Sequence, residues 1–114
     1  LAGNEIKVTG SLDRYRDCVY IDDVLSALCL SFNKVTDDEI YNVGTGVPTT
    51  VSEIIRTILE VHDKPAEDFT VKNIGAHDGD QHGNYANISK LKSLGWEPKT
   101  QLIKGIEKFY LAVK

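Results

Sequence analysis

The sequence has few cysteines, no methionine and no long hydrophobic run, and these shortages exclude several classes of protein. Two cysteines among 114 residues are too few for a small secreted domain built on disulfides. No apolar run approaches the roughly 20 residues of a membrane-spanning helix, and no basic-then-apolar leader is present. The 13 Lys and Arg are interspersed with 17 Asp and Glu, unlike the basic stripe of a nucleic-acid surface.

The composition that remains is that of one ordinary globular domain. Hydrophobic residues make up 41% and charged residues 26% of the chain, and 114 residues can enclose a single modest core. Cys18 and Cys29 lie in apolar stretches, where a free thiol packs like a small hydrophobic side chain. We therefore expect residues 1–114 to form one reduced, cytoplasmic domain that binds neither nucleic acid nor membrane.

The first half of the sequence predicts two βα pairs. A short strand is expected over residues 5–8, and the apolar run Cys18–Ile21 has the pattern of a strand covered on both faces. Asp22 and Asp23 are candidate N-caps for a helix that reaches about Phe32. Residues 40–43 repeat the buried-strand pattern. Thr50 and Glu53 then form a capping box, which begins an amphipathic helix that Pro65 ends.

The second half predicts one more strand and two helices. The strand covers residues 69–71, and a polar loop follows over residues 75–84. Asn87 can cap a short helix over residues 88–94 that stops at Gly95. The last helix, residues 102–113, should bury a stripe that consists of Leu102, Ile106, Phe109 and Val113. The predicted class is α/β (α+β), a small βαβα unit followed by a strand and two helices.

Three segments in order resemble the nucleotide-sugar epimerases and dehydratases of the extended short-chain dehydrogenase/reductase family. Residues 16–24, RDCVYIDDV, are similar to the family's RDFVYVDDV stretch, and residues 41–46, YNVGTG, to its YNVGSG turn. Gly79-Asp80, YANISK at 85–90 and LGWEP at 94–98 resemble its third motif. The similarity runs nearly from end to end, and it implies the C-terminal, substrate-binding lobe of such an enzyme.

The resemblance implies a role for two residues at the diphosphate of a nucleotide sugar. In the family the Arg of the first motif reaches that diphosphate, and Arg16 occupies its place. A second phosphate-binding Arg usually stands two residues before the Gly-Asp pair, where this chain has His77, and a neutral imidazole is a poor replacement. The alternative for Arg16 is that it only flanks a strand and is solvated.

The resemblance also implies that NAD is bound by the full-length family but not by this chain. The nicotinamide site needs a glycine-rich βαβ unit and a Tyr-x-x-x-Lys pair, which the family carries upstream of the matching segments. Hydride chemistry belongs to that cofactor. We therefore expect a truncated lobe that is not an enzyme alone. Two alternatives stay open: a fragment or subunit of an active NAD-dependent epimerase or dehydratase, and an oligomerising module unrelated to sugars.

Three local patterns suggest other sites, and each has a simpler explanation. Tyr110 and Lys114 have Tyr-x-x-x-Lys spacing, but they end the last helix and no glycine-rich loop precedes them. Gly44 and Gly46 lack the third glycine of a dinucleotide fingerprint, and a tight turn explains them. The loop residues Asp78, Asp80 and His82 echo a calcium loop without its bidentate Glu, so no metal site is predicted.

The helix of residues 22–32 is expected to form an interface between copies of the chain. Apolar residues surround almost its whole circumference: Val24, Leu25, Leu28, Leu30 and Phe32. In the family, this helix and the strand at 40–43 pack against the cofactor domain. Without that domain, the helix would be exposed and the strand would present an open edge. We therefore expect a homodimer or a larger homo-oligomer.

Overall fold

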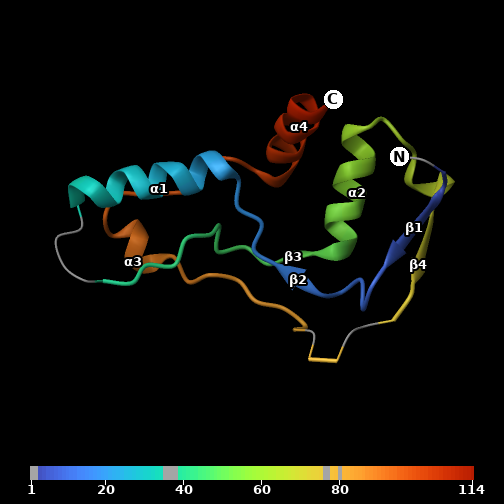
Figure 1. The fold of residues 1–114 in the computed structure, drawn as a ribbon, viewed down its shortest axis with the longest axis horizontal. Helices are drawn as coiled ribbons and strands as arrows, with labels where there is room; N and C mark the ends of the chain where they lie inside the picture. The colour runs from blue at the N-terminus through green and yellow to red at the C-terminus, as the bar shows by residue number, and fades with distance from the viewer. Residues whose placement is uncertain (1–2, 35–38, 76–77, 80) are drawn as a thin grey trace.

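The computed structural model describes residues 3–34, 39–75, 78–79 and 81–114. The chain is elongated, with extents of 51 × 34 × 18 Å. Helices α1 (Ile21–Lys34) and α3 (Ser89–Lys92) lie at one end, a parallel strand pair lies at the other, and α2 (Val51–Val61) and α4 (Leu102–Val113) stand between them (Figure 1). This mixture of helices and strands agrees with the expected α/β class.

The strands form two separate pairs. β1 (Glu5–Val8) runs parallel to β4 (Thr70–Asn73), as βαβ connections usually do. β2 (Tyr15–Arg16) is antiparallel to β3 (Thr49–Thr50), so that Arg16 lies opposite Thr49. The 3-10 turn η1 (Ala66–Asp68) precedes β4. The strand expected over residues 5–8 is present, and the one expected over residues 69–71 is found slightly later.

Helices α2 and α4 pack against each other, and α2 stands between α4 and the β1/β4 pair (Figure 1). Thr50 caps α2 as predicted, because its hydroxyl accepts the N–H of Glu53 at 3.1 Å. Helix α4 has the expected bounds, and Leu102 and Ile106 are half-buried. The rest of its expected buried stripe is wrong, since Phe109 is 65% and Val113 is 64% exposed.

The two apolar runs predicted to be strands, residues 18–21 and 40–43, have no strand structure. An extended run needs a neighbouring strand to complete its hydrogen bonds, and none pairs with these runs in the described parts of the chain. The carbonyl of Tyr20 instead accepts the N–H groups of Asp23 at 3.0 Å and Val24 at 3.3 Å. Helix α1 therefore begins at Ile21, and both Asp22 and Asp23 lie in its first turn rather than at its N-cap.

The main core lies where α1 crosses α3 and the segment that follows α3. Its buried members are Ala27, Ile88, Leu91 and Trp96. Gly95 ends the turn after α3 with a φ of +95°, a conformation that favours glycine. The short helix expected over residues 88–94 is limited to Ser89–Lys92, and Ile88 rather than Asn87 is its N-cap. Asn87 still accepts the N–H of Ser89 at 3.1 Å. Within the described ranges, no helix is both long and apolar enough to cross a bilayer.

Candidate functional site

Arg16 lies at the end of β2, where a remote segment of the chain crosses it. The N–H of Tyr15 donates to the carbonyl of His82 at 3.1 Å, and Tyr15 forms a bridge with Gly83. The guanidinium of Arg16 donates to the carbonyl of Gln81 at 3.0 Å and reaches that of His82 at 3.5 Å. A third bond, to the carbonyl of Tyr15, is 2.8 Å long. Arg16 is half-buried and its guanidinium plane is held by backbone carbonyls.

The other predicted phosphate-binding residue, His77, lies outside the described residues, and so does Asp80. The structure nevertheless brings Arg16 to residues 81–82, at the far end of the loop that contains position 77. His82 packs edge-on against the ring of Tyr15, with ring centroids 5.7 Å apart. In the described parts of the chain, no three His, Cys, Asp or Glu side chains gather as a metal site would require.

Asp17, which sequence reasoning did not single out, joins three segments next to Arg16. Its Oδ1 accepts the N–H of Thr45 at 2.7 Å and the Thr45 hydroxyl at 2.6 Å. Its Oδ2 accepts the N–H of Gly46 at 2.9 Å and that of Ala86 at 3.1 Å. Burial tends to raise the pKa of Asp17, but the hydrogen bonds, led by those from Thr45, together lower this pKa below its usual value.

The two glycines of the 44–46 turn are explained by this carboxylate and by the turn itself. A Cβ on Gly44 would lie 2.5 Å from Oδ2 of Asp17 and 2.9 Å from the Cβ of Ala86. Gly46 has a φ of +77°, which a side chain would strain. Close packing and turn geometry therefore account for both glycines without a dinucleotide.

Tyr110, on the last turn of α4, contacts both His62 and Lys114. The ring of Tyr110 lies 4.3 Å from that of His62, centroid to centroid, at the contact of α2 and α4. The ammonium of Lys114 lies over the same tyrosine ring, 5.9 Å from its centre. Tyr110 is therefore engaged in packing, while Lys114 is exposed to solvent.

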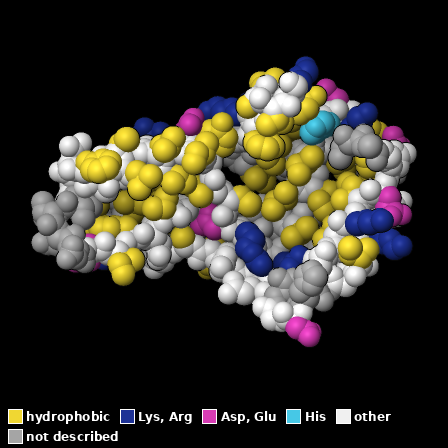
Figure 2. Space-filling model, viewed as in Figure 1, with side chains coloured by type: hydrophobic (Ala, Val, Ile, Leu, Met, Phe, Trp, Pro, Cys, Tyr) yellow, Lys and Arg dark blue, Asp and Glu magenta, His cyan; other side chains and the backbone are white. Residues whose placement is uncertain are grey.

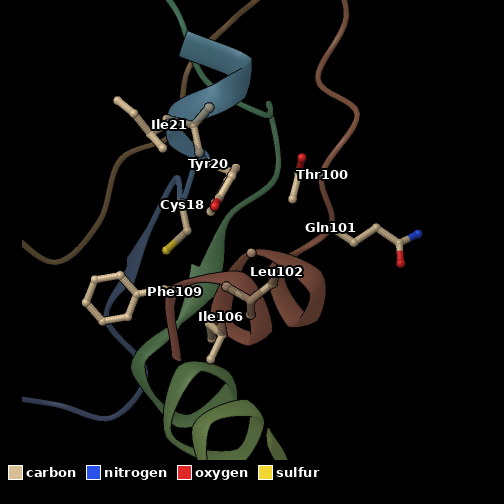
Figure 3. Close-up of a pocket in the computed structure, with 10 residues that line it drawn as sticks. Cys18, Tyr20, Ile21, Thr100, Gln101, Leu102, Ile106 and Phe109 are labelled. Carbon is tan, nitrogen blue, oxygen red and sulfur yellow. The ribbon is translucent and has the colours of Figure 1, made fainter. Parts of the chain in front are cut away.

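A largely apolar pocket of about 310 Å³ lies between residues 18–21 and α4 (Figure 3). Cys18 and Tyr20 line one side, and Leu102, Ile106 and Phe109 line the α4 side. Burial, and secondly the negative charge of Asp17, raises the pKa of the Cys18 thiol. The pocket therefore presents a neutral thiol and hydrocarbon, which suits an apolar occupant.

One face of α1 carries an exposed apolar stripe that continues toward this pocket. Hydrophobic side chains gather over α1 and again over α4 on the face shown in Figure 2. The stripe comprises Ile21, Leu25, Leu28 and Phe32, which are 50–87% exposed. The expectation of apolar residues around most of α1 holds in part, because Ala27 is buried and Leu30 packs on the core. Large exposed apolar patches on a protein surface usually mark an interface.

Comparison with known proteins gives matches along almost the whole chain. The UDP-glucose 4-epimerase of Mycolicibacterium smegmatis is 31% identical over 109 residues, which are 95% of this chain and 34% of that protein. The crystal structure of the Thermotoga maritima UDP-glucose 4-epimerase with UDP-glucose superposes with a TM-score of 0.83 at 31% identity, and it covers 96% of this chain and 36% of the other. No family model matches the chain.

A second solved structure gives the same result. The UDP-glucose 4-epimerase of Thermus thermophilus, in complex with NAD, has a TM-score of 0.74 at 29% identity and covers 90% of this chain and 32% of the other. The fold and sequence together define a relative of the NAD-dependent nucleotide-sugar epimerases. The chain is homologous to one part of these extended short-chain dehydrogenases/reductases, and the matches are consistent with their C-terminal portion. It spans about a third of the length of the relatives it matches.

Proposed function

We propose that this chain is a nucleotide-sugar-binding lobe in which Arg16 pairs with the diphosphate, and that it is not catalytic alone. The observation that carries the proposal is the placement of Arg16. Arg16 is half-buried as a residue, and its guanidinium is oriented by the carbonyls of residues 81–82. These bonds come from its two terminal nitrogens, and within the described ranges no acceptor engages its Nε–H. The chain matches an epimerase solved with UDP-glucose over 96% of its residues.

The chemistry of a guanidinium supports this assignment. Its planar fork can donate to two phosphate oxygens at once, and it stays charged at any physiological pH. Among the described residues, carbonyl contacts engage at most three of its five N–H groups, which leaves donors for an anion. A single charge-assisted contact of this kind contributes about 1.5–3 kcal/mol. We propose His77 as the second, weaker contact, because its position follows the family pattern.

The experiment is a titration with UDP-glucose, followed by chemical-shift mapping and calorimetry, on the wild type and Arg16→Ala. We expect the variant to bind about tenfold more weakly or worse. Arg56→Ala is the matched control, because Arg56 is an exposed arginine on α2, and it should bind like the wild type. His77→Arg should strengthen binding. Equal affinities of the wild type and Arg16→Ala would remove Arg16 from the site and refute the proposal.

On this proposal, NAD is bound in family members by regions that have no counterpart in residues 1–114. The Gly44–Gly46 turn and Tyr110 are engaged in packing, which supports the proposal that neither contacts a nicotinamide cofactor. Titration with NAD⁺ should therefore give no heat, and no epimerase or dehydratase activity is expected from the chain alone. Micromolar NAD⁺ affinity would favour the alternative that the chain contributes directly to an active enzyme. The free cysteines suit a reducing compartment, and we propose the cytoplasm.

A second proposal concerns the exposed stripe of α1, which we assign to a second copy of this chain. The four stripe residues are separated by four, three and four positions, the spacing of a two-helix seam. The first turn of α1 carries the exposed Asp22 and its last turn carries the exposed Lys34. An antiparallel pair therefore places each acidic end beside a basic end, and one two-fold axis covers both stripes.

A further inference from the structure

Three consecutive residues, Tyr15, Arg16 and Asp17, attach the same remote segment at residues 81–86. The backbone N–H of Tyr15 and the guanidinium of Arg16 both donate to carbonyls of residues 81–82. Oδ2 of Asp17 accepts the N–H of Ala86 at 3.1 Å. Arg16 thus lies between two points at which the chain is tied to this segment.

Asp17 also ties its own backbone to a third segment. The same carboxylate accepts three hydrogen bonds from Thr45 and Gly46, at 2.6–2.9 Å. Residues 17–20 have no regular secondary structure, so no ladder of backbone bonds holds the chain after Arg16. In its place, four hydrogen bonds to one side chain fix the backbone at residue 17.

The chemistry of this cluster requires a carboxylate. All four donors converge on two oxygens, and each oxygen accepts two of them. An asparagine of the same shape would turn an NH₂ group toward the donors of one oxygen. It would lose at least one bond from a backbone N–H, because an N–H cannot accept, whereas the Thr45 hydroxyl could. Gly44 provides the space for the carboxylate, since a Cβ there would lie 2.5 Å from Oδ2.

We propose that Asp17 is a positioning residue for Arg16. By fixing the backbone on one side of Arg16 and the 81–86 segment on the other, it holds the guanidinium where a nucleotide diphosphate meets it. The inference rests on the proposed function for the identity of the ligand. The predicted rigidity of the Arg16 side chain is independent of the proposed function, because it can be measured in the ligand-free protein.

The first test is a double-mutant cycle on the 114-residue chain with UDP-glucose as the probe. Asp17→Asn should weaken binding about fivefold or more, because a misplaced guanidinium loses most of its phosphate contact. In the Arg16→Ala background, the same substitution should change the affinity by less than about twofold, because Asp17 acts through Arg16. Independent, additive losses, or a destabilised Asp17→Asn variant with wild-type affinity, would overturn the inference.

The matched control is Asp23→Asn. Asp23 is also an aspartate that accepts two backbone N–H groups, those of Lys99 at 3.1 Å and Thr100 at 3.0 Å. Its substitution should lower stability without altering UDP-glucose affinity. Thr45→Val is the milder variant in case Asp17→Asn does not fold, because it removes one hydroxyl donor and leaves the backbone donors. It should weaken binding by a smaller factor in the same direction, and wild-type affinity of a folded Thr45→Val would count against the inference.

The second test needs no ligand and separates this inference from the proposed function. The ¹⁵N relaxation of the Arg16 Nε–H group should indicate an ordered side chain in the wild type and in Asp23→Asn. It should indicate a mobile side chain in Asp17→Asn. If Arg16→Ala binds UDP-glucose normally but this pattern is observed, the proposed function fails and the positioning role stands. An ordered Arg16 in Asp17→Asn would refute the positioning role itself.

Discussion

The indole Nε1 of Trp96 donates to the backbone carbonyl of Asp23 at 3.1 Å, across 73 positions of sequence. The same N–H lies 2.9 Å from the hydroxyl of Ser26. Asp23 completes the connection, since its carboxylate accepts the N–H groups of Lys99 and Thr100. Both Trp96 and Asp23 are 4% exposed. The first turn of α1 is therefore held to the segment after α3 by buried polar contacts as well as by apolar packing.

Trp96→Phe should lower the free energy of unfolding by about 1–3 kcal/mol, because it removes a buried donor and leaves a small cavity. Urea denaturation followed by circular dichroism measures the change. Tyr85→Phe is the control, because Tyr85 is 56% exposed, and it should change stability by less than about 0.5 kcal/mol. An equal effect of both substitutions would show that the indole contacts contribute nothing.

Stability should fall in acid partly through Asp17. Its pKa in the folded chain lies below the ordinary 3.8, so the unfolded chain takes up this proton first as the pH falls. The stabilisation from Asp17 is therefore complete above the unfolded pKa and is lost as the pH falls from about 4 toward the folded pKa. The Tm difference between the wild type and Asp17→Asn should narrow over that interval. A constant difference between pH 6 and pH 3 would contradict this linkage.

The two cysteines should differ in reactivity toward iodoacetamide. Cys18 is half-buried with a raised pKa, so little of its thiol is ionised near neutral pH, whereas Cys29 is exposed on α1. Mass spectrometry of the alkylated protein should find Cys29 modified first. Cys18→Ser and Cys29→Ser identify which site gives each rate. Faster alkylation of Cys18 would mean that the pocket beside α4 opens in solution.

The sequence predicted the helices better than the strands. The Thr50 cap and the bounds of α4 followed from local chemistry, which needs no distant partner. The runs at 18–21 and 40–43 have the composition of buried strands, yet a strand depends on a neighbour elsewhere in the chain, and none pairs with them in the described ranges. The exposure of Phe109 likewise depends on which side of α4 is covered, and helical periodicity alone does not determine this.

The candidate site was predicted in part. The resemblance placed Arg16, and the structure adds the carbonyls of residues 81–82 that orient it. Asp17 was missed because its partners, Thr45, Gly46 and Ala86, are 28–69 positions away. The sequence analysis explained Gly44 by a tight turn, but the structure explains it by the close approach of the Asp17 carboxylate, 2.5 Å from where a Cβ would stand.

Self-association through α1 gives the last prediction. Four large apolar side chains on one helix face are at least half exposed, and burying each contributes about 1.5–3 kcal/mol. Light scattering after size exclusion at micromolar concentration should therefore give a mass above the 12.6 kDa of one chain. Cys29 follows the stripe residue Leu28 in the sequence, so self-association should cover its thiol. Its alkylation should therefore become slower as the protein concentration rises.

The variant Leu28→Asp tests whether Leu28 lies in an interface or in the core. Leu28 is 53% exposed in the single chain, which favours the interface. A charge in the middle of the stripe should dissociate the assembly to 12.6 kDa and leave the far-ultraviolet circular dichroism unchanged. The matched control is its neighbour Ala27→Asp, which places the same charge in the buried core beside Trp96 and should unfold the chain. A wild-type mass of 12.6 kDa at all concentrations would refute self-association. The exposed stripe would then be the surface for a cofactor-binding partner, as in the alternative of a two-part enzyme.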